Sequence, residues 1–373
     1  MQMLGLYVLR GLIIFLAVAT LLPFVKVGYW PVRLCDFFRF QIAVVSLASV
    51  LGIAIWAWQS GDWRAWGIWM AVVGAVGVWQ ISHVIPYTPA WKKEVETSAP
   101  GDQETLAVAV VNLKVENDKK QQVLEQIREL QVNMLLLIEI DEAWDAALQP
   151  LQADYPYRHG VVRGEGLGLM LWSKIPLQAP ETRHLVSPDR ASIFAKLQIA
   201  AGPHGHNQEV RFVGVHPLPP GLAEKNDDGR HDSRIRDAEL MLIAEEVAQT
   251  PDAYWVVTGD FNDVAWSHTT RMFQRISGLA DPRVGRGLYN TYHANYPWIR
   301  FPIDQVFLSP GARIHQLGRF HPKGSDHFAI TTNFSFVSDG PPPEPLQEGD
   351  IEEAEEMIDE GRDDAAKNSA RET

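Results

Sequence analysis

The chain is poor in cysteine and has no excess of basic residues. A single cysteine, Cys35, occurs in 373 residues, which excludes an intramolecular disulfide framework and a zinc site built from several thiolates. Lys and Arg number 33 against 46 Asp and Glu, so the formal net charge is −13. That balance excludes a generic basic protein that coats DNA. No internal repeat is evident, and the composition excludes a collagen or coiled-coil fibre.

Charge and aromatic residues are unevenly distributed along the chain. Residues 1–93 hold seven Lys or Arg, two Asp and eight of the thirteen Trp, a net charge of +5. Residues 339–373 hold thirteen acidic and three basic residues, so the stretch between these two must carry −8. We therefore predict a membrane domain over 1–93, a linker over 94–104, a catalytic body over 105–337 and an acidic tail over 338–373.

Three long apolar runs lie in the first quarter of the chain, at residues 4–24, 40–58 and 66–85. Each is long enough to cross a bilayer core of about 30 Å as a helix, which takes about 20 residues. Trp residues lie at the ends of these runs, where interfacial aromatic residues are expected. A signal peptide is not expected, because no basic segment precedes the first run and two more runs follow it. The pattern predicts three transmembrane helices, with the lipid bilayer as partner.

The basic residues that flank these runs predict the orientation. Lys26, Arg33 and Arg39 follow the first run and Lys92 and Lys93 follow the third, whereas the opposite side has only Arg64. Because cytoplasmic loops carry the excess of Lys and Arg, this count favours a cytoplasmic body.

The tail combines few apolar residues with high acidic charge. That composition predicts disorder, with at most a short transient helix around 351–360. An acidic interaction tail and a solubilising tail both fit the composition.

The body alternates short apolar runs with loops and a few helical stretches. The spacing of Val123, Ile127 and Leu130 predicts a helix over 118–131, and similar spacing predicts another over 234–249. Many strands and few helices are typical of two packed sheets flanked by helices. The expected strands lie at 106–111, 134–140, 168–173, 193–199, 210–215, 254–258, 304–308 and 328–336.

Polar residues occur where these strands begin or end, so they can converge at one rim of the sheets. Their oxygen atoms are ligands that suit Mg²⁺ or Mn²⁺. Taken singly, each residue also has a purely structural explanation, such as an Asx turn, a cap or a core histidine. A purely structural role explains Glu139 less well, because burying an unpaired carboxylate costs free energy. The residues are Asn112, Glu139, His216, Asp260, Asn262, Asp304, Asp326 and His327.

The ordered series resembles the endonuclease/exonuclease/phosphatase superfamily, which includes DNase I, over residues 105–337. The matching segments are VVNL, LLIEI, GLGLMLWSKIP, GVHPLPP, VVTGDFND, PIDQVFLS and GSDH. The resemblance implies a four-layer α/β sandwich, in which two packed mixed β-sheets are flanked by helices, here preceded by three transmembrane helices. It is nearest to membrane-anchored bacterial members, which implies a multi-pass protein of the bacterial inner membrane and a Mg²⁺- or Mn²⁺-dependent phosphoric ester hydrolase.

The same resemblance implies roles for the metal and water ligands. Glu139 would bind the divalent metal, with Asn112 and Asp326 nearby. Asp260 would activate or orient the attacking water, and Asn262 would hold that water or the phosphate.

Four further residues would act on the phosphate. His327 would contact the scissile phosphate, and Asp304 would fix its tautomer and favour its charged form. His216 would be a phosphate ligand or the acid for the leaving group. Arg190, in the segment PDRASIFAKL, would correspond to an arginine that touches substrate in the family.

The substrate stays open at this point among nucleic acid, a lipid head group and a small phosphodiester. The net charge of −8 over the body leaves no basic track for a long nucleic acid. A non-catalytic binding module and a membrane scaffold on the same fold are the alternatives, although every expected catalytic position is filled. No obligate protein partner is evident.

Overall fold

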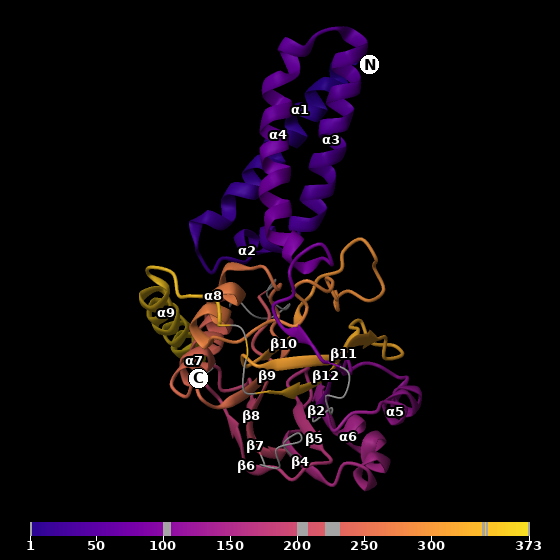
Figure 1. Ribbon diagram of the computed structural model, residues 1–373, viewed down its shortest axis with the longest axis vertical. Helices are drawn as coiled ribbons and strands as arrows, with labels where there is room; N and C mark the ends of the chain where they lie inside the picture. The colour runs from indigo at the N-terminus through magenta and orange to yellow at the C-terminus, as the bar shows by residue number, and fades with distance from the viewer. Residues whose placement is uncertain are drawn as a thin grey trace.

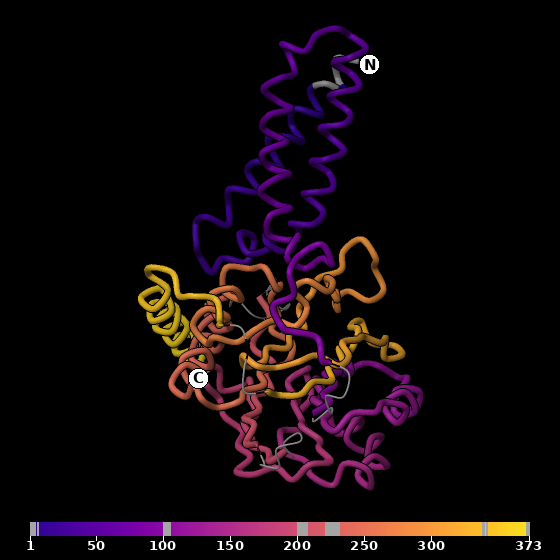
Figure 2. Tube along the Cα trace, in the orientation of Figure 1, coloured from indigo at the N-terminus to yellow at the C-terminus, as the bar shows by residue number. Residues whose placement is uncertain are grey.

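The computed structural model consists of a helical bundle that stands on an α/β body, with the C-terminal helix against the side of the body (Figure 1). The N-terminus lies at the far end of the bundle, and the C-terminus lies beside the body (Figure 2). The structure describes residues 2–99, 106–199, 208–220, 232–337, 340 and 342–371. Parts of the predicted linker, 100–104, and of the predicted tail, 338, 339, 341, 372 and 373, therefore lie outside the described residues.

The bundle contains α1 (Gln2–Leu21), α3 (Arg39–Ser60) and α4 (Trp63–Val84), with the short helix α2 (Trp30–Phe37) at its base. Within the described residues, three stretches are long and apolar enough to cross a membrane: Tyr7–Val25, Arg39–Ser60 and Trp63–Tyr87. These agree with the three apolar runs of the sequence. Gly61 ends α3 with a φ of 72°, and Asp62 begins α4 by accepting a hydrogen bond from the Ala65 amide.

In the part of the body that the structure describes, the strands form two mixed sheets. The first has the order β1-β11-β12-β2-β3-β5-β4 and the second the order β10-β9-β8-β7-β6. The pairs β1–β11, β2–β3 and β8–β9 are parallel, and the remaining pairs are antiparallel. The strands are β1 (Glu96–Thr97), β2 (Leu106–Asn112), β3 (Met134–Ile138), β4 (Tyr157–Val161), β5 (Leu169–Ser173), β6 (Gln178–Arg183), β7 (Ser192–Ile199), β8 (Gln208–Val215), β9 (Tyr254–Asp260), β10 (Asp304–Leu308), β11 (Ala312–Phe320) and β12 (Ala329–Phe336).

Helices cover the outer faces of both sheets, which completes four layers. Side chains on one face of β2, including Val108 and Val110, pack between the sheets. Side chains on its other face, including Ala109 and Val111, pack with α5 (Lys120–Arg128) and α6 (Glu142–Leu148). The helices α7 (Arg234–Ala248) and α8 (His268–Ser277) cover the second sheet. Because central strands are buried on both faces, they read as continuous apolar runs in the sequence.

The C-terminal segment differs from its prediction as a disordered tail. That prediction is wrong for α9 (Asp350–Arg371), which lies along α7 (Figure 1). Ala354, Met357, Ile358 and Ala365 are buried, a spacing that places them on one face of a helix. Gly361 allows the close approach, because a Cβ there would lie 2.6 Å from the Arg234 carbonyl oxygen.

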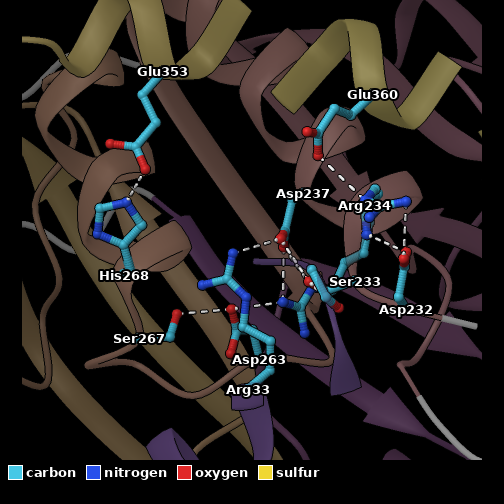
Figure 3. Close-up of polar contacts among 12 residues, drawn as sticks. Arg33, Asp232, Ser233, Arg234, Asp237, Asp263, Ser267, His268, Glu353 and Glu360 are labelled. Carbon is cyan, nitrogen blue, oxygen red and sulfur yellow. Dashed lines mark hydrogen bonds and ion pairs between the residues drawn. The ribbon is translucent and has the colours of Figure 1, made fainter. Parts of the chain in front are cut away.

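Ion pairs neutralise much of the acidic charge of α9. Arg275 bonds both carboxylate oxygens of Asp350, and Arg234 contacts Glu360 and Asp364. The Glu353 carboxylate lies 2.6 Å from His268 Nε2 (Figure 3). It also lies 2.7 Å from Lys26 Nζ, so it joins the body to the segment after α1. The prediction of disorder relied on the net charge of the segment, which does not take these ion pairs into account.

Candidate active site

The predicted site residues are brought together where strands of the two sheets end. Asn112 ends β2, and Glu139 directly follows the parallel strand β3. Asp260 ends β9, and Asp304 begins the antiparallel neighbour β10. The register pairs Asp304 with Asp260, so two buried carboxylates lie side by side on adjacent strands.

His327 connects these two carboxylates. Its Nδ1 lies 2.9 Å from Oδ2 of Asp304 and its Nε2 lies 3.8 Å from Oδ2 of Asp260. All three side chains are buried. The His327 amide donates to the hydroxyl of Ser325, and that hydroxyl donates to the Asn112 carbonyl. These two hydrogen bonds fix the segment that leads into β12 to the end of β2.

Burial and neighbouring charges shift the pKa values in this group. Burial, followed by the negative charge of Asp304, raises the pKa of Asp260 to about 7. Burial alone would lower the pKa of His327, but the charge and hydrogen bond of Asp304 together with Asp260 raise it to about 9. A charged imidazolium bonded to Asp304 and close to Asp260 is therefore the favoured state near neutral pH.

Glu139 forms a second part of the site beside this group. Its Oε1 accepts a hydrogen bond of 3.0 Å from Asn112 Nδ2, and its Oε2 accepts one of 3.2 Å from the Val115 amide. Its φ of 63° is in the left-handed region, which a non-glycine residue rarely adopts. The backbone at Gly168 can approach this turn closely because glycine has no Cβ. A Cβ at that position would lie 1.8 Å from the Ile140 carbonyl oxygen.

Arg190 and His216 border the site from the second sheet. Arg190 Nη1 donates to the Gly166 carbonyl and lies 3.4 Å from His216 Nδ1. Burial, then the positive charges of Arg190 and His327, hold the pKa of His216 well below its usual range, so His216 is neutral. Among the described residues, none hydrogen-bonds to the buried Nε of Arg190.

Asn262 and Asp326 lie at the edges of the site. The Asn262 amide donates to Asp260 Oδ1, and Asn262 Nδ2 donates to the Pro217 carbonyl. Asp326 is paired with Lys114, whose Nζ lies 3.2 Å from Oδ2 of Asp326. Asp326 thus faces a lysine in this structure.

A family model agrees with this arrangement. The model of the Endonuclease/Exonuclease/phosphatase family matches residues 110–327, which is more than half of the chain. The chain belongs to the endonuclease/exonuclease/phosphatase family. Members of this family are hydrolases that act on phosphoesters. No curated protein sequence matches the chain.

Solved structures share the fold at low sequence identity. A humanized D. rerio TDP2 carrying 14 mutations is 14% identical, with a TM-score of 0.50, and the match covers 62% of this chain and 100% of that one. A Bacteroides thetaiotaomicron family protein is 15% identical, with a TM-score of 0.48 and coverage of 63% and 100%. The human Nocturnin catalytic domain is 16% identical, with a TM-score of 0.47 and coverage of 67% and 100%.

Two sets of side chains have the chemistry to hold a metal ion. Within the described residues, Asp260, Asp304 and His327 offer ligand atoms that lie within 4.8 Å of one another. His327 Nδ1, however, bonds Asp304 and the pKa of the ring lies at about 9, so a metal bound by this ring at neutral pH would have to displace its proton. The Glu139 carboxylate, which accepts a hydrogen bond from Asn112 Nδ2, is a hard oxygen donor of the kind that binds divalent cations.

Two residues near the site, Lys114 and Tyr292, are not among the site residues predicted from the sequence. Lys114 places a charged amine beside Asp326. Burial lowers the pKa of Lys114, but the charge and hydrogen bond of Asp326, together with nearby Glu116 and Glu139, raise it above its usual value. The Tyr292 ring lies 4.9 Å from the His327 ring. The available signal for Lys114 was its position directly after the VVNL motif. The available signal for Tyr292 was the aromatic-rich segment 288–298, which fits either the lining of a substrate pocket or packing.

Proposed function

We propose that this protein is a membrane-anchored, divalent-metal-dependent phosphoesterase that hydrolyses a phosphodiester by in-line attack of an activated water. The observation that carries the proposal is the buried Asp304–His327 pair beside Asp260 and across from Glu139. A binding module or scaffold has no need for a desolvated carboxylate whose pKa lies near neutrality. Mg²⁺ or Mn²⁺ is the proposed cofactor.

Asp260 and His327 have complementary roles in this proposal. Asp260 accepts the proton of the attacking water, because a general base is most effective when its pKa lies near the working pH. The imidazolium of His327 stabilises negative charge on the phosphate, and Asp304 holds that ring in place. Asn262 orients the water or the phosphate from the same loop as Asp260.

The remaining site residues bind charge on the substrate. A cation held by Glu139, with Asn112 and Asp326 nearby, would stabilise charge on the phosphate oxygens. Arg190 offers its unpartnered Nε to the phosphate, and neutral His216 fits a hydrogen-bonding role there better than that of an acid.

The three apolar stretches support a membrane anchor. Full-length protein is expected to stay in the membrane fraction after high-salt and carbonate washes, because spanning helices satisfy their own backbone hydrogen bonds in lipid. Immunoblots of washed membranes measure this. Release of the full-length chain by either wash would contradict the proposed anchor. In this proposal the body lies on the cytoplasmic side, which the count of positive flanking residues favours.

A surface loop next to the site favours a substrate at the bilayer surface. Trp298 is 87% exposed and Tyr296 is 57% exposed. Gln41, near the start of α3, donates to the Trp298 carbonyl, so this loop lies where an apolar stretch begins. The same loop leads back to Tyr292 beside His327. Exposed Trp and Tyr at this level are typical of a membrane interface.

A substrate panel on purified full-length protein tests the proposal. Plasmid DNA, oligoribonucleotides, inositol phosphates and vesicles of phosphodiester lipid are incubated with Mg²⁺ or Mn²⁺, with and without EDTA. We expect hydrolysis that EDTA abolishes and added metal restores, and Trp298→Ala is expected to slow only the vesicle reaction. Hydrolysis that resists EDTA would exclude the metal-dependent mechanism. An absence of turnover on every substrate would favour the scaffold alternative.

A further inference from the structure

The segment that carries two of the proposed catalytic residues is held by the membrane-proximal part of the chain. We define residues 260–267, from the last residue of β9 to the residue before α8, as the catalytic loop. Inside it, Asp263 Oδ2 accepts a hydrogen bond from Ser267 Oγ, and Asn262 has a φ of 51°. This strained, charged loop is buried, so its conformation depends on partners outside it.

Arg236 on α7 is the first of these partners. Its side chain is 0% exposed, and its Nη1 donates to the Asn262 carbonyl at 2.7 Å. Its Nη2 lies 3.1 Å from Asp263 Oδ2 and 2.7 Å from Asp237 Oδ1. One guanidinium therefore faces two buried carboxylates, which would leave one negative charge unbalanced.

Arg33 on α2 balances that charge from the other part of the protein. Its Nη2 lies 3.2 Å from Asp237 Oδ2, and its side chain is buried (Figure 3). Burial would raise the pKa of Asp237, but Arg236 and then Arg33 hold it below its usual range. Two guanidinium groups and two carboxylates then form a neutral cluster, the arrangement that lets charges be buried at tolerable cost.

Other contacts fix α2 and the end of α4 against the same loop. Trp266 Nε1 donates to the Asp36 carbonyl, and the hydroxyl of Tyr87 donates to the Ala265 carbonyl. Ser233, which also bonds Asp237, donates to the Gly28 carbonyl. Several hydrogen bonds therefore connect the base of the bundle to the catalytic loop and to the start of α7. They hold α2, and with it Arg33, against the body.

We propose that Arg33 is a positioning residue of the active site, which acts through Asp237 and Arg236 on the catalytic loop that carries Asp260 and Asn262. The inference rests on the proposed phosphoesterase activity for its kinetic readout. It assigns the N-terminal region a part in catalysis beyond anchoring. A body that begins near residue 95 lacks Arg33 and leaves Asp237, among the described residues, with Arg236 as its one cationic partner beside the Ser233 hydroxyl.

The test compares full-length variants in detergent or vesicles. Arg33→Gln is expected to lower kcat by about tenfold or more with little change in KM, and to raise hydrogen exchange of the amides in residues 260–267. Arg33→Lys keeps the charge and should recover most of the turnover. Arg33→Gln combined with Asp237→Asn restores a balanced cluster and should recover part of it. The control is Arg64→Gln, which removes an exposed arginine in the first turn of α4.

The outcomes separate this inference from the proposed function. Unchanged kcat and unchanged exchange in Arg33→Gln would overturn the inference, as would a double variant no better than Arg33→Gln. If Arg33→Gln fails to fold, the double variant and Arg33→Lys carry the same comparison. If wild-type protein hydrolyses no phosphodiester, the proposed function fails, while the exchange of the catalytic loop still decides whether Arg33 positions it.

Discussion

His327→Ala is expected to lower the turnover of an accepted phosphodiester by about a thousandfold or more, because it removes both a buried positive charge and a donor aimed at the phosphate. Asp304→Asn should cause a smaller but still large loss. The carboxylate at position 304 bonds His327 Nδ1 at 2.9 Å, so its removal leaves the ring present but less well held and less often charged. Steady-state kinetics of the full-length variants measure both effects.

The double variant shows whether the two residues act as a unit. If they do, the pair of substitutions should be little worse than His327→Ala alone, since coupled residues are strongly non-additive. Fully additive losses would show that Asp304 acts independently of His327. His315→Ala is a matched control, because His315 bonds Ser335 on β12 and belongs to no part of the site.

The pH dependence of kcat follows from the same contacts. Activity should rise as Asp260 ionises around pH 7 and fall as His327 loses its proton around pH 9, which gives a bell-shaped profile. Asp304→Asn removes a like charge from Asp260 and an opposite charge from His327, so both pKa values fall. Both limbs should therefore move to lower pH, and a profile that keeps its limbs would contradict this.

The fold could be predicted largely because its central strands are buried on both faces. The apolar runs at 106–111, 134–140 and 254–258 became β2, β3 and β9, as expected. The edge strands β4 and β6 were missed, since their sequences are mostly polar and partly exposed and show no apolar run. Their pairing is decided by the neighbouring strand, which a local pattern does not contain.

The fate of the acidic tail could not be predicted from its composition. The apolar spacing of Ala354, Met357 and Ile358 was present in the sequence, but the basic partners of the acidic residues lie far away. Arg234 and Arg275 are on other helices, so only the folded structure shows that they pair with α9.

The strand-end residues of the site could be predicted for a similar reason. These residues lie at the ends of buried strands or directly next to them, and such strands fix where their ends meet. The residues are Asn112, Glu139, Asp260 and Asp304. The supporting cluster around Arg236 could not be found this way. Arg33 and Asp237 are 204 residues apart in the chain, and nothing in either local sequence indicates the other.

Glu139→Gln is expected to weaken the binding of Mg²⁺ or Mn²⁺ and to lower turnover by about a hundredfold or more, because it removes the negative charge that offsets the cation's loss of water. The substitution keeps the size of the side chain. A glutamine has one carbonyl oxygen, so it can accept from Asn112 or from the Val115 amide but not from both. The thermal stability of the variant should therefore fall slightly, while the protein remains folded.

Direct metal binding separates this effect from a loss of structure. Wild-type protein should gain thermal stability on addition of Mg²⁺ or Mn²⁺, since a ligand that binds the folded state stabilises it, and Glu139→Gln should gain much less. Glu165→Gln makes the same chemical change on an exposed residue of the neighbouring turn and should behave as wild type. Equal stabilisation of Glu139→Gln and wild type would place the cation elsewhere, with the Asp260–Asp304–His327 group as the next site to test. That result would also require His327 to release its proton on binding metal, so the affinity would rise steeply with pH.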